Sequence, residues 1–460
     1  MTAYARGATA RGHRPLKLAV WSPLPPSPSG IADYVAETLD ELSRHADLVL
    51  VVEDPSSVEA AIRNRYPVLG HEQPAGADLD VYHLGNSPSH AYVYRAAVRR
   101  PGVAVLHDWS LHHLVLRETV ERGDVQGYLR EMRRAHGETG TFVGRQVARA
   151  LGGEVFPALF PLNDRVLEES LAVVGLTGYV RSRAARRLPG RRVIHLPHHL
   201  SLPFDPLPAR AEARRRLRLP ADALIVTAPG LASRAKRLDL ALRALGRLRG
   251  PYPALHLVVA GGVDPSLPLA EWARAAGFDA RLTVTGRLDI QDFVLHLCAA
   301  DAVLALRFPS HGEISGALVR ALGAGRPAFV TGGTPASDEF PEGVVIPVDP
   351  GPHEEAELEA LLEHLLARPG LRDAIGRVAR EHVLRHHGLA STVAALAAFL
   401  DEVHAAKPEV LKVLAADRPR DGLAGFLVEE VRSAARDLGL AGVRLGLEGL
   451  LGELVEPKRR

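Results

Sequence analysis

Glu313 is the only acidic residue in a polar loop, residues 310–315, which follows an apolar run and precedes a helix expected at residues 316–325. The free backbone N–H groups and the positive end of the dipole make the first turn of a helix an anion site. A carboxylate beside such a site suits contact with hydroxyl groups of the molecule that carries the anion. This stretch therefore predicts a site for a phosphorylated, hydroxyl-bearing ligand. The alternative is a surface turn with a solvated glutamate.

A second group of residues suited to phosphate is basic. Arg234, Lys236 and Arg237 crowd the start of an expected helix, where the helix dipole disfavours cations, and Asp239 offsets only part of this. A bound polyphosphate would stabilise the cluster through charge-assisted hydrogen bonds. The alternative is a solvated basic turn.

Two further candidates stand in the first half of the chain, where His107 and Asp108 directly follow the apolar run 103–106. Ligands of open parallel sheets bind outside the carboxyl ends of the strands, which makes both side chains site candidates. Gly30 stands just before another expected helix, where the backbone can approach a ligand closely. The alternatives are a helix-capping aspartate, a packed histidine and a rigid structural crossover.

Strand-like apolar runs alternate with helical stretches in both halves of the chain, a pattern typical of βαβ units around parallel sheets. A proline-rich polar segment, 201–210, separates the halves and is the best linker candidate. We therefore expect an α/β protein with a flexible tail (1–14), an N-terminal Rossmann-like domain (15–203), a C-terminal Rossmann-like domain (204–390), a helix returning to the N-terminal domain (391–406) and a helical appendage (407–460).

Composition limits the functions to consider. The 460 residues include 56 Lys and Arg against 54 Asp and Glu, a formal net charge of +2. This balance lacks the strong positive charge typical of proteins that bind nucleic acids. The single cysteine, Cys298, excludes an internal disulfide, and the N-terminus lacks the apolar core of a secretory signal. We expect no apolar run long enough to span a bilayer. A cytoplasmic protein is expected, and short basic patches leave open peripheral attachment to an anionic membrane surface.

Several segments resemble those of one enzyme family, in the right order along the chain. In the first half these are PSPSGIADY (26–34), HLGNSPSH and VAVLHD, which resemble a bacterial subgroup. In the second half they are GLASRAKRLDLALRAL (230–245), LTVTGRLD (282–289) and HGEISGALVRALGAGRP, which resemble the family's phosphate, base-flanking and donor-sugar segments. Over most of residues 16–405 the chain resembles the group 1 (family 4) retaining glycosyltransferases. This implies the GT-B fold, in which two Rossmann-like domains, one for the acceptor and one for the nucleotide-sugar donor, face a central cleft.

The resemblance also implies roles for single residues. Lys236, with Arg234 or Arg237, would neutralise the donor diphosphate, and backbone amides at 315–318 would bind the same phosphates. Glu313 would hold hydroxyls of the transferred sugar. The catalytic set would be His107, Asp108, Glu313 and Lys236. The donor-binding set would be Gly30, Gly230, Arg234, Lys236, Arg237, Gly286, Arg287, Leu288, Glu313, Ile314, Ser315, Gly316, Ala317, Leu318 and Arg320.

Within these sets, the segment 286–288 would border the nucleotide base, and Gly30 would leave room for the diphosphate. His107 would face the sugar, with Asp108 as its neighbour or as a group on the acceptor side. The chain departs from the family at its E-x7-E pair, whose second glutamate contacts the nucleotide ribose. Arg320 stands at that second position, and the first acid is displaced by one, with Gly312 where a glutamate is commoner. Arg320 would instead meet phosphate or a different donor group.

The reaction implied is transfer of a sugar from a nucleotide donor to a glycan or lipid-linked acceptor in bacterial cell-surface polysaccharide or glycoconjugate synthesis. Departure of the diphosphate builds negative charge that Lys236, nearby arginines and a helix N-terminus would stabilise. No Asp-x-Asp signature is evident, so we expect neither a metal nor another cofactor. The alternatives are a catalytically silent GT-B protein that binds a nucleotide or glycan, and a GT-B sugar-nucleotide epimerase. A dehydrogenase is disfavoured because no G-x-G-x-x-G follows the first strand of either half.

Overall fold

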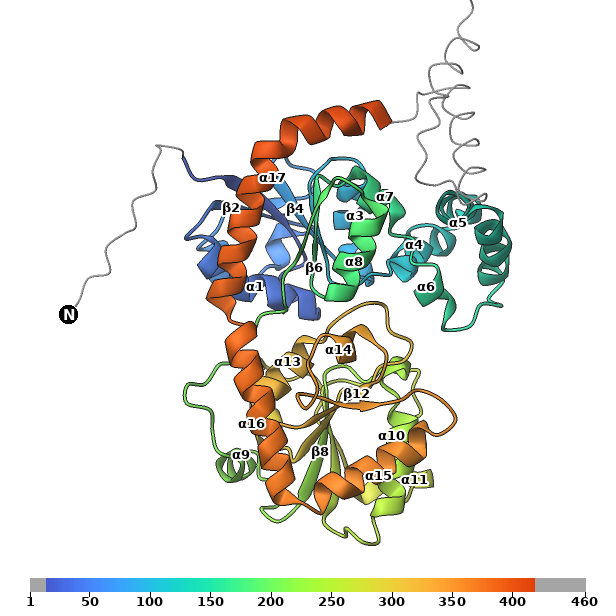
Figure 1. Cartoon of the computed structure of the whole chain (residues 1–460), viewed down its shortest axis with the longest axis vertical. Helices are drawn as coiled ribbons and strands as arrows, with labels where there is room; N and C mark the ends of the chain where they lie inside the picture. The colour runs from blue at the N-terminus through green and yellow to red at the C-terminus, as the bar shows by residue number, and fades with distance from the viewer. Residues whose placement is uncertain (1–13, 418–460) are drawn as a thin grey trace, which may run out of the picture.

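The chain folds into two α/β domains, one above the other in Figure 1. The computed structural model describes residues 14–417 of the 460. The N-terminal domain contains a 7-stranded sheet in the order β3-β2-β1-β4-β5-β6-β7, and the C-terminal domain a 6-stranded sheet in the order β10-β9-β8-β11-β12-β13. All neighbouring strands within these sheets pair in parallel. The prediction of two Rossmann-like domains with parallel sheets is confirmed.

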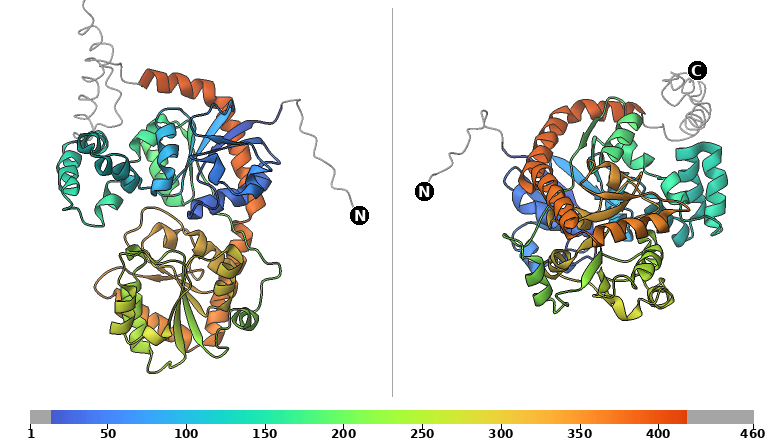
Figure 2. Two further views of the ribbon diagram at one scale, coloured as in Figure 1. Left: turned by 180° about the vertical axis from the view of Figure 1, so that it is seen from behind. Right: turned by 60° about the horizontal axis from the view of Figure 1, so that its bottom comes forward.

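The N-terminal sheet is formed by β1 (Lys17–Trp21), β2 (Asp47–Val52), β3 (Val68–Gly70), β4 (Leu79–Leu84), β5 (Val103–Leu106), β6 (Ala172–Gly175) and β7 (Arg192–His195). The helices of this domain are α1 (Gly30–Leu42), α2 (Ala60–Arg63), α3 (Ala91–Ala97), α4 (His112–Glu118), α5 (Val125–Ala148), α6 (Phe156–Leu159), α7 (Asp164–Glu169) and α8 (Gly178–Arg187). Helices α4, α5 and α6 form a lobe at the side of the domain, visible from both directions in Figures 1 and 2.

The C-terminal sheet is formed by β8 (Leu224–Pro229), β9 (Leu255–Ala260), β10 (Leu282–Val284), β11 (Ala302–Leu304), β12 (Ala328–Thr331) and β13 (Ile346–Val348). Around it lie α9 (Arg210–Arg216), α10 (Leu238–Leu248), α11 (Leu269–Ala275), α12 (Ile290–Ala299), α13 (Gly316–Gly323), α14 (Pro335–Asp338), α15 (Glu354–Leu366) and α16 (Pro369–His386). The last described helix is α17 (Leu389–Asp417).

Strand order decides which loops meet at the carboxyl edge of each sheet. In the C-terminal sheet β8 lies between β9 and β11. The chain first adds β9 and β10 on one side of β8, and it then adds β11, β12 and β13 on the other side. Ligands of open α/β sheets bind at such a reversal, outside the carboxyl ends of the strands. The loop after β8 holds Lys236, and the loop after β11 holds Glu313, so this topology brings together two segments that the sequence separates.

The chain crosses between the domains twice, at adjacent places. Leu200 and Gly388 form an isolated parallel bridge, and the backbone N–H of Leu200 donates to the carbonyl of His387 at 2.7 Å. A ring nitrogen of His387 lies 2.7 Å from the carbonyl oxygen of His198. After this point α17 runs up along the N-terminal domain beside α1 (Figure 1).

Helix α17 is long and apolar enough to cross a membrane by length and composition, which corrects our expectation that no run would be. The reason is that its apolar residues serve the core. Val393, Phe399 and Val403 are buried in the same cluster as Val35 and Leu39 of α1. A core helix of a soluble protein passes the same test, so the finding carries no membrane assignment. The exact domain boundaries stay predictions, and residues 418–460 of the expected helical appendage lie outside the described residues.

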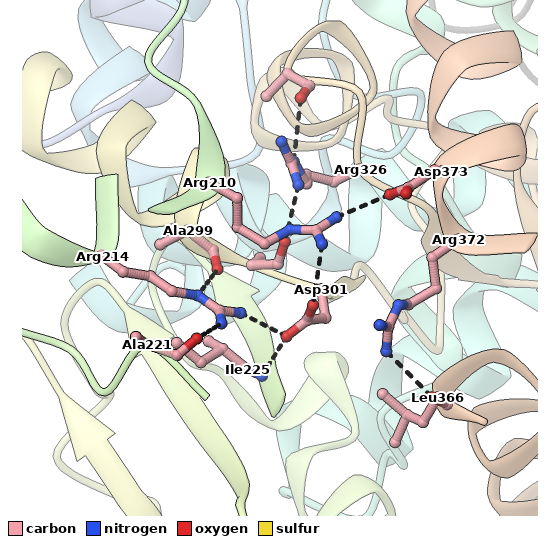
Figure 3. A network of polar contacts seen from close by, with 12 residues as sticks. Arg210, Arg214, Ala221, Ile225, Ala299, Asp301, Arg326, Leu366, Arg372 and Asp373 are labelled. Atoms are coloured by element: carbon pink, nitrogen blue, oxygen red, sulfur yellow. Dashed lines mark hydrogen bonds and ion pairs between the residues drawn. The ribbon is translucent and has the colours of Figure 1, made fainter. Parts of the chain in front are cut away.

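A buried ionic network holds α9 against the C-terminal sheet (Figure 3). Asp301, just before β11, is 2% exposed and lies 2.6 Å from the guanidinium of Arg214. The same carboxylate oxygen accepts the backbone N–H of Ile225 in β8 at 2.8 Å. Arg214 also donates to the carbonyl oxygens of Ala221 and Ala299. Because each charge has several partners, the network stabilises the amino ends of the strands in this sheet. The carboxyl ends, where ligands bind, lie at the opposite edge.

Two details of secondary structure do not follow from the apolar pattern of the sequence. The apolar run 172–180 is not one strand, because β6 ends at Gly175 and Thr177 caps α8, whose Val180 N–H donates to the threonine hydroxyl at 3.2 Å. The edge strand β3 has only three residues, too few to give a periodic signal.

Candidate active site between the domains

The loops at the carboxyl edges of the two sheets touch each other. The backbone N–H groups of Trp109 and Ser110, just after β5, donate to the carbonyl of His311 at 2.7 and 3.0 Å. The hydroxyl of Thr177 donates to the carbonyl of Gly312 at 3.3 Å. Gly312 has φ +90°, and a Cβ there would lie 2.4 Å from the Cβ of Trp109. A side chain at 312 would therefore collide with the N-terminal domain, which gives a physical reason why the acid stands at 313 instead.

Glu313 is buried and its carboxylate is used by its own loop. One oxygen accepts the backbone N–H of His311 at 2.6 Å and the hydroxyl of Ser310 at 3.2 Å. The other lies 2.9 Å from the guanidinium of Arg307. These contacts fold the loop after β11 around the carboxylate.

Lys236 lies beside the same loop. The backbone N–H of Phe308 donates to the carbonyl of Ala235 at 2.8 Å, which aligns the segment 307–308 with the segment 235–236. The ammonium of Lys236 donates to the carbonyl of Pro229. Burial, and after it the charge of Arg307, lowers the pKa of Lys236 to about 7. Lys236 and Arg307 are thus two cations close enough to repel each other, and an anion bound between them would favour the charged form of the lysine.

The two other basic candidates of this segment point elsewhere. Arg237 pairs with the buried Glu354, and Arg234 lies 3.1 Å from Glu154, in the segment between α5 and α6. Both line a pocket of about 430 Å³ between that segment and the C-terminal domain, with Val155, Phe308 and Trp272 among the other lining residues. The structure does not bring Arg234 or Arg237 into the cluster of Lys236, Arg307 and Glu313.

His107 and Asp108 occupy the carboxyl end of β5, as expected. A ring nitrogen of His107 lies 3.0 Å from one of His83, and the edge of the Tyr34 ring packs against it. Burial, followed by neighbouring histidines, lowers the pKa of His107 well below its ordinary value, so the ring is neutral. Asp108 accepts the backbone N–H of Asn86 at 2.7 Å. Burial, then the charge of Glu313, raises the pKa of Asp108 to about 7.

The glycines of the predicted set either have open space around them or adopt a positive φ that favours glycine. A Cβ on Gly30 would meet nothing within 4 Å, and Gly286 has φ +72° with open space beside it. Gly230 has φ +78°, and a Cβ there would lie 3.2 Å from the ammonium of Lys236. Arg287 reaches across to the N-terminal domain, where its guanidinium donates to the carbonyl of Pro26 at 3.3 Å.

In the segment 313–320 the side chains divide between the core and the interface. Ile314 and Leu318 are buried in the core, so only their backbone amides remain for a ligand, and Leu288 packs against a small cluster in the same domain. Ser315 is the N-cap of α13 and accepts the backbone N–H of Val319 at 3.1 Å. The preceding N–H groups, at Gly316, Ala317 and Leu318, have no such helical acceptor.

Arg320 does not join Glu313. Its guanidinium lies 2.5 Å from a carboxylate oxygen of Glu37 in α1, and the other oxygen lies 2.8 Å from His199. Next to it, His198 covers the start of α13, because a Cβ on Gly316 would lie 2.8 Å from its Nε2 atom. Arg320 was predicted to contact a donor group, but in this structure its charged contact is with Glu37 of the other domain.

Sequence reasoning missed Arg307, Glu37 and His198 as residues of the site. Arg307 was visible as a cation three positions beyond a strand, at the edge where ligands bind. Glu37 and His198 gave no such signal, because each acts through a contact with the other domain. Within residues 14–417 no group of three or more His, Cys, Asp or Glu is arranged to hold a metal ion.

The second half of the site lies in a segment with known relatives. A family described as "Glycosyl transferase-like" matches residues 234–398. D-inositol 3-phosphate glycosyltransferase from Saccharomonospora viridis is 30% identical over 218 residues, 45% of this chain and 49% of the relative. The enzyme of the same name from Thermobifida fusca is 25% identical over 339 residues, 70% of this chain and 71% of the relative. The chain spans about half the length of the first curated relatives it matches.

Solved structures share the fold over most of the chain. Sucrose-phosphate synthase from Thermosynechococcus elongatus superposes with a TM-score of 0.60 at 17% identity, covering 85% of this chain and 100% of that one. Anabaena HepE in complex with UDP and glucose gives 0.57 at 14% identity, covering 84% and 100%. WaaG, a glycosyltransferase involved in lipopolysaccharide biosynthesis, gives 0.56 at 15% identity, covering 83% and 98%.

Two parallel-sheet domains with loops meeting between them, and these structural neighbours, define the GT-B fold. The matched family and the curated relatives agree with what the sequence motifs predicted, because both make the chain similar to glycosyltransferases, most clearly over residues 234–398.

Proposed function

We propose that this protein transfers a sugar from a nucleotide-sugar donor to a glycan or lipid-linked acceptor, with retention at the anomeric carbon and without a metal. The observation that carries the proposal is that Lys236 and Arg307 lie on hydrogen-bonded segments at the reversal between β8 and β11, and that the loop after β11 leads into the N-terminus of α13. HepE, a structural neighbour, has been solved in complex with UDP and with UDP-glucose, which supports a nucleotide-sugar donor.

The chemistry required of the protein is mainly electrostatic. When the bond between the sugar and the diphosphate breaks, negative charge grows on the leaving oxygens. The buried cation Lys236 and the free N–H groups of α13 are fixed before the reaction and need no reorganisation at that moment. The contacts between Trp109 and His311 join the loops of the two domains, and a closed arrangement of this kind would exclude water and so limit hydrolysis of the donor.

In the N-terminal domain, His107 is neutral, so it does not repel the positive charge that develops on the sugar ring. Its ring, fixed by His83 and Tyr34, offers a rigid surface at the end of β5. Asp108 lies one residue further, where a carboxylate that gains and loses a proton near neutral pH suits an acceptor hydroxyl. We assign Asp108 to the acceptor and His107 to the sugar.

A lipid-linked acceptor requires access to a membrane surface, and the helical lobe supplies a suitable face. Phe142 of α5 is 65% exposed, and Leu151 and Leu159 beyond it are 67% and 64% exposed. Arg145 and Arg149 follow Phe142 at helical spacing and lie on the same side. Exposed apolar side chains with cations on the same lobe suit an anionic bilayer. These features support our proposal of a cytoplasmic protein that attaches peripherally to the inner face of the membrane and acts in the synthesis of bacterial surface polysaccharide or glycoconjugate.

Vesicle sedimentation tests this placement. Wild type should bind vesicles of phosphatidylglycerol and phosphatidylcholine more than vesicles of phosphatidylcholine alone, and Phe142→Ser with Leu159→Ser should lose the binding. Equal recovery of wild type and variant would remove the membrane from the proposal. A concentration-dependent dimer that the same variant abolishes would assign this face to a second copy instead.

A catalytically silent binding protein is the second candidate, favoured by the pairing of Arg320 with Glu37 in place of a ribose contact. The test for both is thermal unfolding with UDP, GDP, ADP, dTDP and CMP, then with the matching sugar nucleotides, with and without EDTA. A ligand at about a hundred times its Kd adds about 2.7 kcal/mol. One responder that is turned over without metal supports the transferase. A responder that is never turned over supports the silent protein. No response contradicts the transferase and leaves a silent protein that binds a glycan.

A further inference from the structure

Arg307 lies where the donor diphosphate is proposed to bind, although nothing in its motif marked it. Its backbone N–H donates to the hydroxyl of Thr331 at 2.9 Å, which fixes the chain just beyond β11. The next residue, Phe308, is hydrogen-bonded to Ala235 at 2.8 Å. Arg307 and Lys236 therefore extend from neighbouring, hydrogen-bonded segments at the same edge of the sheet.

Glu313 holds the guanidinium of Arg307 in place. The distance from the guanidinium to the carboxylate is 2.9 Å, and within residues 14–417 no other carboxylate lies at ion-pair distance from it. A guanidinium carries five N–H donors, so this contact leaves donors for a second anion. The side chain of Arg307 is 34% exposed, while that of Glu313 is 9% exposed. The arginine is thus supported from the protein side and open on the other.

The charges of this cluster are unbalanced. Lys236 has a neutral partner, the carbonyl of Pro229, and within the described residues no carboxylate lies at ion-pair distance from it. Glu313 offsets only one of the two cations, and it also accepts the N–H of His311 and the hydroxyl of Ser310. A buried cation without a counter-charge is costly, so the cluster is suited to receive an anion.

We propose that Arg307 binds the donor diphosphate together with Lys236, and that Glu313 is a positioning residue that holds Arg307 and the loop 310–313. This rests on the proposed function, because it names a further group at the same donor site. It gives Glu313 a different role from the contact with sugar hydroxyls that the family resemblance implies. One oxygen of Glu313 accepts hydrogen bonds from Ser310 and His311, and the other is in an ion pair with Arg307 but has no hydrogen bond of its own. These contacts with the chain are the reason for the change of role.

The experiment is a calorimetric titration of the full chain with the nucleoside diphosphate, among UDP, GDP, ADP and dTDP, that gives the largest thermal shift. Arg307→Ala should weaken binding by roughly tenfold to a hundredfold, the scale of lost charged hydrogen bonds. Arg307→Lys should recover part of this, because it keeps the charge but not the forked geometry. Arg377→Ala, an exposed arginine in α16 of the same domain, is the matched control and should bind as wild type does.

Glu313→Gln separates the two roles of the carboxylate. As a positioning residue it should weaken nucleoside diphosphate binding nearly as much as Arg307→Ala, and the double variant should bind no more weakly than Arg307→Ala alone. Unchanged nucleoside diphosphate affinity with lower kcat would overturn the positioning role and restore the hydroxyl contact.

The outcomes distinguish this inference from the proposed function. If wild type binds none of the four nucleoside diphosphates, the proposed function fails. If wild type binds one and Arg307→Ala and Arg307→Lys bind it equally well, only the assignment of Arg307 fails. Unfolding temperatures without ligand identify a variant that is not folded, and Arg307→Lys then decides the question.

Discussion

Arg320 of α13 and Glu37 of α1 form an ion pair of 2.5 Å that joins the two domains. His199, in the crossing between the domains, lies 2.8 Å from the other oxygen of the same carboxylate. The side chains of Arg320 and Glu37 are 11% and 17% exposed, so each leaves the other as a poorly solvated charge when it is removed. The residue at the family's second glutamate position therefore stabilises the closed arrangement of the domains.

We expect Arg320→Ala and Glu37→Gln each to lower the unfolding temperature by several degrees, on the scale of about 1–3 kcal/mol. The double variant should lose less than the sum, because both single changes break the same contact. Thermal unfolding of the four proteins measures this coupling. Strictly additive effects would mean that the pair does not form in solution.

Restoring the family's acid should not restore its function. Arg320→Glu places a second carboxylate beside Glu37, and the like charges should separate the domains and increase the radius of gyration measured by X-ray scattering. A gain in nucleoside diphosphate affinity would instead show that position 320 faces the ribose.

Binding of a nucleoside diphosphate should take up a proton at Lys236. The pKa of this lysine is lowered to about 7 by burial and by Arg307, and an added diphosphate favours the charged form. Affinity should therefore fall as pH rises from about 7 to 9, by at most about tenfold per unit. Calorimetry at pH 8 in buffers of different ionisation enthalpy measures the uptake. Lys236→Arg, always charged, is the control, and equal proton uptake by both proteins would contradict the prediction.

Asp108 should give stability a distinct pH profile. Its folded-state pKa is about 7, above the ordinary 3.8, so folding favours the protonated carboxyl. This contribution is complete below about pH 4 and is lost as pH rises through 7. Relative to Asp108→Asn, wild type should become less stable from about pH 4 to 7 and level off above. Unfolding temperatures of both proteins across this range test it, and a difference that is constant with pH would contradict it.

Gly312→Ala should open the domain interface without unfolding either domain. The added Cβ would collide with Trp109 at 2.4 Å, so the loop contacts with the N-terminal domain should be lost. Gly343→Ala is the control, because Gly343 has a similar φ of +85° but open space around it. Scattering should show expansion for Gly312→Ala only. Expansion in both variants would attribute the effect to backbone strain.

Asp301→Ala should destabilise the C-terminal domain by roughly 3–5 kcal/mol, because it leaves the buried Arg214 without its carboxylate. The network lies away from the carboxyl edge, so the folded fraction should keep its nucleoside diphosphate affinity. Thermal unfolding with and without ligand measures both quantities. A variant with normal stability and weaker ligand binding would contradict this division of roles.

Features set by neighbouring residues could be predicted from the sequence, whereas contacts between residues far apart in the chain could not. The strand Val103–Leu106 was predicted to the residue, because an apolar run followed by His107 and Asp108 is a local pattern. The pairing of Arg320 with Glu37 joins residues 283 positions apart, and no local pattern reports it. Gly312 was predicted to be a departure from the family pattern, but the Cβ of Trp109, with which a side chain at 312 would collide, belongs to the other domain. Ile314 and Leu318 were named as ligand contacts, while their side chains serve the core.

The adjacent crossings at Leu200 and Gly388 restrict how the domains can move. Because the two connecting segments are bonded to each other at one point, opening is expected to be a rotation about that point rather than a translation. His199 places the pair of Glu37 and Arg320 next to this pivot, whereas the Trp109 loop precedes α4, on the opposite side of the domain from α17 (Figure 1). A given rotation displaces atoms in proportion to their distance from the pivot. A rotation of a few degrees can therefore break the contacts of His311 while the ion pair near the pivot persists, so the site between the domains can open while the two domains keep their relative alignment.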